Sequence, residues 1–174
     1  SHSSSERVQV CPTVTERHSY DWGVNENVVP VELDIDWEPN VPAAVLLSND
    51  DGQTALALNS SINDVDTRSV VFVWEGVRFA SMGSPNDEAL SGHRLYARGL
   101  DRIVRLGKVM SSELIAILEV QNSVHPQHEP AWFAGLTHHV LPLKECMVEV
   151  VADTLTIRRI EGSTLEAAAF ALAR

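Results

Sequence analysis

The sequence predicts an α+β fold rich in β-structure, mainly an antiparallel sandwich or partly closed barrel with two or three helices packed on one side. About eight segments have the alternating or continuously apolar pattern of strands, and far fewer have helical spacing. Most connections between the strands have hairpin length. A parallel sheet would require strands and helices to alternate along the chain, and no such alternation occurs.

The first half of the chain predicts strands. In Val29–Glu38 apolar side chains alternate with acidic ones, which is typical of a strand with one buried face. Ala43–Ser48 and Thr54–Asn59 flank an Asn-Asp-Asp-Gly turn, and this pattern predicts a hairpin. Val70–Phe79 begins with five consecutive apolar residues, as expected of a central strand covered on both faces. Gly76 predicts a bulge or a tight turn within it.

The second half predicts strands and helices. Ile103–Val109 is interpreted as a short strand. Ser112–Gln121 has apolar residues at helical spacing and serines at its start, which predicts a helix. Ser163 and Glu166 have the spacing of a capping box for a last helix, Leu165–Ala173. Three further strands are predicted at His138–Leu143, Met147–Ala152 and Thr154–Ile160.

The length of 174 residues predicts one globular domain, which we place at residues 8–174. Residues 1–7 are polar and serine-rich, and we interpret them as a tag remnant or a disordered terminus. No apolar run approaches the roughly 20 residues of a membrane helix, and the start does not resemble a signal peptide. We therefore expect a cytoplasmic protein that does not interact with a membrane.

The net charge is −11, and the whole excess of acidic residues lies in the first 90 residues. Proteins that bind nucleic acid need a positively charged surface, so we expect no nucleic-acid partner. A local basic run does occur, and we expect its members to pair with acidic residues of the same chain. This run contains Arg94, Arg98, Arg102 and Arg105.

Residues 81–99 form the first candidate site, because they follow neither the strand nor the helix period and long unpatterned loops are often functional. Carboxylates beside a histidine supply a general acid and a general base, and arginine suits an anionic or carbonyl group. The alternative is a turn at residues 85–88 that caps a short helix. The predicted catalytic residues are Asp87, Glu88 and His93, and the predicted substrate-binding residues are Asn86, Arg94 and Tyr96.

Residues 122–139 form the second candidate site and contain four of the seven histidines. We add His128 to the predicted catalytic residues and Trp132 to the substrate-binding ones. We expect no metal; if one is bound, His125, His128 and His138 are the predicted ligands. His138 and His139 point to opposite faces of a strand, so only one of them can join any one site. The alternative is that these imidazoles are surface or capping groups.

The leading hypothesis is a small-molecule-binding protein with metal-independent acid–base activity of the lyase, isomerase or hydrolase type. Its pocket is bordered by residues 81–99 and 122–139. The sequence contains no Gly-x-Ser-x-Gly nucleophile motif and no phosphate-binding loop, and it does not identify a cofactor. One alternative is a non-catalytic module that binds a protein partner through an acidic face at Glu32, Asp34 and Asp36. The other is a metalloprotein with histidine ligands.

Overall fold

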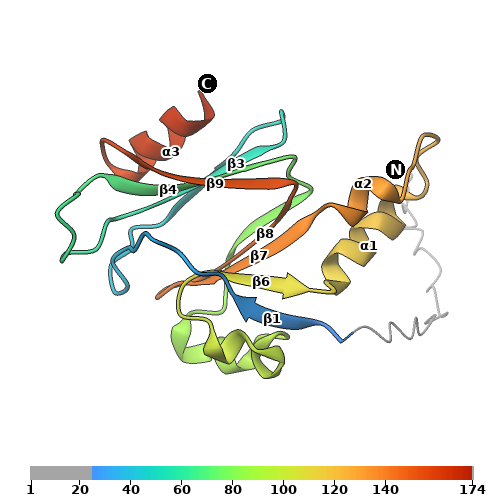
Figure 1. Ribbon diagram of the computed structural model, residues 1–174, viewed down its shortest axis with the longest axis horizontal. Coiled ribbons are helices and arrows are strands. Elements are labelled where there is room, and N and C mark those ends of the chain that lie inside the picture. Colours follow the sequence, from blue (N-terminus) through green and yellow to red (C-terminus); the bar gives the residue numbers. More distant parts are fainter. Residues whose placement is uncertain (1–24, 174) are drawn as a thin grey trace, which may run out of the picture.

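The computed structural model describes residues 25–173, so the prediction for residues 1–7 lies outside the described residues. Within the described part, nine strands form two antiparallel sheets (Figure 1). The five-stranded sheet has the order β1 (Asn27–Pro30), β6 (Gly107–Met110), β7 (Thr137–Pro142), β8 (Met147–Ala152) and β5 (Phe79–Gly83). The four-stranded sheet has the order β2 (Val45–Ser48), β3 (Gln53–Leu58), β4 (Ser69–Glu75) and β9 (Thr154–Ile160).

The two sheets pack face to face and do not close, so the predicted sandwich is confirmed. Their inner faces form the main hydrophobic cluster. In it the Trp37 and Phe72 rings meet edge to face with their centroids 5.4 Å apart, and the Phe72 and Trp74 rings stack with their centroids 5.8 Å apart. Such aromatic pairs add stability beyond the burial of their apolar area. Members of this cluster from the five-stranded sheet include Leu141, Val148 and Val150.

Helices cover both outer faces of the sandwich, and not one side alone as predicted. The helix α3 (Thr164–Leu172) packs on the four-stranded sheet through alanines, and α1 (Glu113–Asn122) and α2 (Ala131–Ala134) pack on the five-stranded sheet (Figure 1). Each sheet also has an apolar outer face, and the helices bury these two faces. Ala55, Ala57 and Val71 lie under α3, and Val151 lies under α1 and α2.

The predicted strand Val29–Glu38 is wrong beyond its first residues. The strand β1 ends at Pro30, and the backbone N–H of Val31 still donates to the carbonyl of Leu106 at 2.9 Å. Residues 32–36 then continue toward the other sheet outside any strand, until Trp37 forms an isolated bridge with Ser60. The apolar side chains of this segment still pack against the core while its acidic side chains are exposed. Alternating burial therefore arises here without strand pairing.

The predicted strand Val70–Phe79 is divided between the two sheets. Its first part is β4, a buried central strand as predicted, and its end belongs to β5 in the five-stranded sheet. Gly76 lies in the connection with a φ of +65°, and a Cβ atom there would overlap the carboxylate of Asp153. The glycine thus serves a tight turn rather than a bulge.

The remaining elements agree more closely with the sequence. Ser112 is the N-cap of α1, and the capping box of Ser163 and Glu166 is present at α3. The predicted strand Ile103–Val109 is shorter, because a turn of 3-10 helix, η3 (Leu100–Arg102), is followed by loop up to β6. Two other 3-10 turns, η1 (Asp87–Gly92) and η2 (Tyr96–Arg98), lie in the loop of the first candidate site. None of the helices in residues 25–173 has the length and apolar character needed to cross a membrane.

Gly99 joins η2 to η3 with a φ of +109°, and an added Cβ atom would lie 2.6 Å from the carbonyl oxygen of Val28. We expect Gly99→Ala to lower the free energy of unfolding by about 2 kcal/mol, because it combines a left-handed backbone with a backbone clash. Urea unfolding measures the change. The matched control is Gly92→Ala, whose Cβ would meet no atom within 4 Å. Equal stability of the two variants would contradict the prediction.

Candidate functional site

The candidate site is centred on Glu149, the one acidic residue in the otherwise apolar strand β8. Its Oε1 atom accepts a hydrogen bond from Nε2 of His93 at 3.1 Å. Its Oε2 atom accepts from Nε2 of His138 at 2.9 Å and from Nη2 of Arg94 at 2.8 Å. Three donors from two distant segments therefore meet on one carboxylate, whose side chain is only 15% exposed.

The charge state of Glu149 fixes the tautomers of both histidines. Burial raises the pKa of Glu149, but the hydrogen bond from His138, the charge of Arg94 and the hydrogen bond from His93 outweigh it and lower the pKa to about 2. An ionised carboxylate only accepts hydrogen bonds, so Nε2 of each histidine carries the proton. The backbone N–H of Leu95 donates to Nδ1 of His93 at 3.2 Å, which requires the same tautomer when the ring is neutral.

Ser112 extends this arrangement through His138. The His138 ring is fully buried, and its Nδ1 atom lies 2.8 Å from Oγ of Ser112. When His138 is neutral, Nδ1 carries a lone pair and the Ser112 hydroxyl donates to it. Ser112, His138 and Glu149 thus form a chain of hydrogen bonds in the order hydroxyl, imidazole, carboxylate. Nucleophile sites of this type are recognised by such geometry rather than by sequence position.

A sharp turn between strand and helix places Ser112. The strand β6 ends at Met110, and Ser111 has a φ of +52°, which is uncommon for a residue other than glycine. Ser112 follows as the N-cap of α1, where its Oγ atom accepts the N–H of Ile115 at 3.2 Å. Its hydroxyl therefore lies at the positive end of the helix dipole, which favours negative charge.

A second buried carboxylate, Glu26, ties the polar loop to the start of α1. It is 5% exposed and accepts hydrogen bonds from Nη1 of Arg94 at 3.2 Å, Nη1 of Arg98 at 3.3 Å and the backbone N–H of Glu113 at 3.0 Å. Arg98 also pairs with the Glu113 side chain at 2.9 Å. Arg94 consequently bridges Glu26 and Glu149 and holds the loop against the helix that carries Ser112.

A pocket of about 690 Å³ lies between the end of β6, α1 and α2, and Ser112 is one of its lining residues. Volumes of this order are typical of small-molecule sites. Its charged lining residues are Lys108 and Glu119, and its apolar ones include Ile115, Phe133 and Leu136. The arrangement thus combines a hydroxyl, its hydrogen-bonded imidazole and a mainly apolar cavity.

Of the residues predicted in loop 81–99, His93 and Arg94 lie in the site. Asn86 caps η1 by accepting the N–H of Ala89, as the capping alternative predicted. Asp87 instead pairs with Lys144 at 2.6 Å, and this hydrogen bond lowers the pKa of the Asp87 carboxyl. The Glu88 side chain is exposed, and Tyr96 begins η2. Neither side chain makes a hydrogen bond or ion pair within residues 25–173.

Of the residues predicted in loop 122–139, only His138 reaches Glu149. Nδ1 of His128 is bonded to Asn122 at 2.9 Å, and His125 and Trp132 are exposed. His138 lies in the strand β7, so loop 81–99 reaches the second candidate segment at this strand, through the shared contacts of His93, Arg94 and His138 with Glu149. Across the described part of the chain, no three His, Cys, Asp or Glu side chains are grouped so as to hold a metal ion.

Three site residues were missed from the sequence, namely Ser112, Glu149 and Glu26. Ser112 was interpreted only as a helix cap. Glu149 carried a usable signal, because a single acid inside an apolar strand must find partners when it is buried. Glu26 precedes the first strand and stands in no pattern that distinguishes it.

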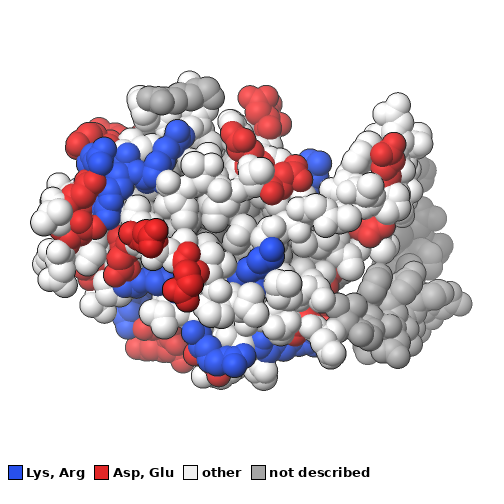
Figure 2. Space-filling model, in the orientation of Figure 1, with Lys and Arg blue, Asp and Glu red and all other residues white. Residues whose placement is uncertain are grey.

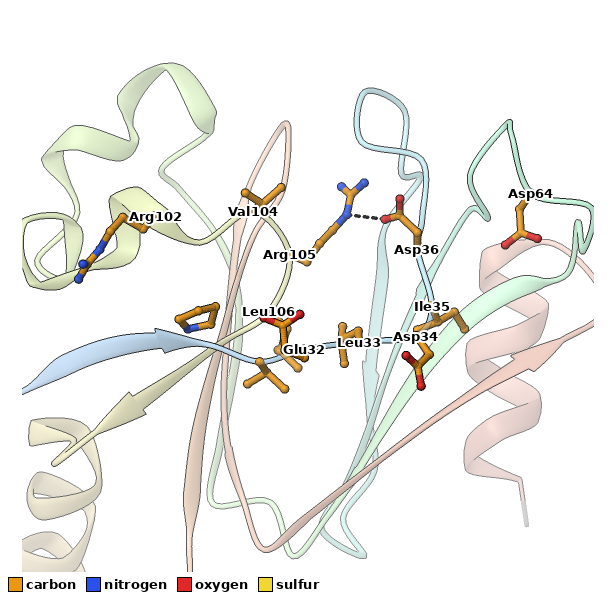
Figure 3. A pocket seen from close by; sticks show the side chains of 12 residues that line it. Glu32, Leu33, Asp34, Ile35, Asp36, Asp64, Arg102, Val104, Arg105 and Leu106 are labelled. Carbon is orange, nitrogen blue, oxygen red and sulfur yellow. Dashed lines mark ion pairs between the residues drawn. The ribbon is translucent and has the colours of Figure 1, made fainter.

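A second hollow, of about 610 Å³, lies between residues 30–36 and 102–106 (Figure 3). Arg105 forms an ion pair with Asp36 across it (Figure 3). The guanidinium carbon of Arg105 lies 5.0 Å from the centroid of the Trp37 ring. Arg102 and Asp64 also border the hollow, so charges of both signs line it. Acidic and basic side chains are likewise interspersed on the face shown in Figure 2. The exposed acids predicted to bind a protein partner are thus part of a mixed surface.

Comparisons of the chain with protein families, with curated proteins and with solved structures find no match to any of them.

Proposed function

We propose that the protein is a metal-independent hydrolase of a small acyl ester or amide, with Ser112 as the nucleophile. His138 acts as the general base, and Glu149 orients its ring. The observation that carries the proposal is the hydrogen-bonded chain from Ser112 through His138 to Glu149, with Ser112 lining a mainly apolar pocket. This sharpens the acid–base hypothesis from the sequence and moves it to a different base and nucleophile.

The proposed reaction has two steps. Oγ of Ser112 attacks the substrate carbonyl carbon while Nδ1 of His138 takes the hydroxyl proton, and His138 then gives this proton to the leaving alcohol or amine as its bond to the acyl carbon breaks. Water next attacks the acyl-serine, giving a proton to His138, and the proton returns to Ser112 as the acid leaves. The positive end of α1 favours the negative charge that develops on the carbonyl oxygen.

Glu149 remains ionised in both steps, because its pKa is lowered to about 2 despite burial. It keeps Nε2 of His138 protonated and stabilises the imidazolium that forms when Nδ1 accepts a proton. His93 and Arg94 act as positioning residues in this proposal, since they bond the carboxylate rather than Ser112. The carboxylate is thereby held in one orientation before the substrate binds.

The test is reaction with a fluorophosphonate probe, followed by mass spectrometry, together with hydrolysis of short-chain 4-nitrophenyl esters. We expect covalent labelling at Ser112 and a fall of about 10³-fold or more in kcat/KM for Ser112→Ala. The loss arises because alanine removes the nucleophile while the pocket remains.

Two further variants separate chemistry from folding. Ser112→Gly is expected to lose activity. Glycine costs only a few tenths of a kcal/mol as an N-cap, but Nδ1 of the buried His138 loses its hydrogen bond from Ser112, so we expect the free energy of unfolding to fall by about 1–3 kcal/mol. Ser163→Gly is the matched control, because Ser163 is likewise an N-cap, here of α3 on the four-stranded sheet, and it is not one of the residues that line the pocket. We expect it to retain the rate. An unlabelled Ser112, or an undiminished rate in a folded Ser112→Gly protein, would overturn the proposal.

A further inference from the structure

The charge of Lys108 lacks a partner within the described part of the chain. Lys108 lies on β6, is half-buried, and lines the same pocket as Ser112. The other half-buried lysine and arginine side chains there are engaged: Lys144 with Asp87, and Arg105 with Asp36. Two more are Arg158, which donates to the carbonyl of Ala171, and Arg159, which pairs with Asp64. Within residues 25–173 the Lys108 side chain is the exception, because it makes neither an ion pair nor a hydrogen bond.

The surroundings of Lys108 favour an anion. An unpaired charge that is partly removed from water is costly, and a counter-ion brought in by a ligand offsets this cost. Among the described residues, Glu119 is the only acidic one that lines the pocket, and its Oε1 atom lies 3.8 Å from Nε2 of His128. The remaining walls are mainly apolar, with Ile115 and Phe133 among them. The pocket thus offers one cation beside apolar surface.

We propose that the pocket selects an acyl group that ends in a carboxylate, with Lys108 binding the carboxylate and the apolar walls binding the chain between it and the reacting carbonyl. This inference rests on the proposed function for the substrate's reacting end, where Ser112 acts. It names the substrate class, the monoesters of small dicarboxylic acids. Lys108 is a binding and specificity residue here and takes no part in proton transfer.

The first experiment compares two esters of similar length, mono-4-nitrophenyl glutarate and 4-nitrophenyl valerate. We expect the wild type to prefer the anionic ester by about tenfold in kcat/KM, and Lys108→Met to abolish the preference mainly by raising KM. Lys108→Arg is expected to restore it. Lys144→Met, a surface lysine paired with Asp87, is the matched control and is expected to keep the wild-type ratio.

The second experiment does not depend on turnover. Calorimetric titration with sodium hexanoate is expected to show binding to the wild type and to Ser112→Gly, and about tenfold weaker binding to Lys108→Met. Added salt is expected to weaken the binding, as for a partly exposed ion pair.

The outcomes separate this inference from the proposed function. If esters are hydrolysed at Ser112 but Lys108→Met leaves the ratio unchanged, the carboxylate selectivity is overturned and the hydrolase proposal stands. If Ser112 is not labelled but hexanoate binding still requires Lys108, the hydrolase proposal falls and the anion site stands. Equal hexanoate binding by the wild type and Lys108→Met would overturn the anion site itself.

Discussion

Replacing Glu149 with glutamine is expected to lower the free energy of unfolding by about 3 kcal/mol and to lower kcat/KM for hydrolysis by about 10³-fold in the same variant. The carboxylate accepts hydrogen bonds from His93, Arg94 and His138, and its side chain is 15% exposed. A glutamine side chain turns an NH₂ group toward at least one of these donors. The charge of Arg94 also loses one of its two buried carboxylates, which leaves Glu26 as the other.

Urea unfolding at pH 7 measures the stability change, and Glu145→Gln is the matched control. Glu145 is the exposed carboxylate in the turn between β7 and β8, and its variant is expected to stay within about 0.5 kcal/mol of the wild type. Loss of activity is scored as fluorophosphonate labelling of protein shown to be folded. If Glu149 orients His138, the pH profile of the remaining rate is expected to shift in Glu149→Gln, and Glu149→Asp is expected to restore part of the rate. If Glu149 only supports the fold, neither effect is expected. A Glu149→Gln protein as stable and active as the wild type would show that the carboxylate is dispensable.

Local patterns predicted much of the fold, because burial on alternate sides and turn chemistry are local properties. The hairpin of β2 and β3, the pair β7 and β8, and the caps of α1 and α3 all follow from short stretches of sequence. Residues 31–36 have the alternating pattern of a strand but do not form one. The alternation of apolar and acidic residues predicts correctly which side chains face the core. It cannot predict strand pairing, because pairing requires hydrogen bonds to the backbone of another segment that is distant in the sequence.

The site could be predicted only in part, because it depends on convergence of distant segments. The residue types of loop 81–99 indicated His93 and Arg94, and the histidines of loop 122–139 included His138. Their common partner, Glu149, lies 56 residues beyond His93 in the sequence. It is inside a strand whose other residues are apolar, as expected of a buried strand. Ser112 is the N-cap of α1, and this local role explains the presence of a serine at this position without any catalytic function. Its contact with His138 is visible only in the structure.

Acid is expected to destabilise the protein through His139 at pH values where most carboxylates are still ionised. The ring is 8% exposed and accepts a hydrogen bond from Nε1 of Trp74 at 3.3 Å. Burial lowers the pKa of His139 from 6.5 to about 4, with smaller contributions from the charges of His138 and Lys108. In the unfolded chain the imidazole keeps its ordinary pKa. The unfolded state therefore binds more protons between pH 6.5 and pH 4, and stability falls as the pH falls through this window.

The expected loss is about 3 kcal/mol between pH 7 and pH 4, from the difference between the two pKa values. Urea unfolding at pH 7, 5.5 and 4.5 measures it. His139→Gln is the decisive variant, because glutamine still accepts the hydrogen bond from Trp74 but does not titrate. Its stability is expected to change far less over the same range, until Glu149 begins to be protonated. The loss of stability due to Glu149 is expected mainly below pH 4.5, because folding lowers the pKa of Glu149 from 4.5 to about 2 and the unfolded chain therefore binds the proton first. Parallel curves for the wild type and His139→Gln would mean that His139 is not the group responsible.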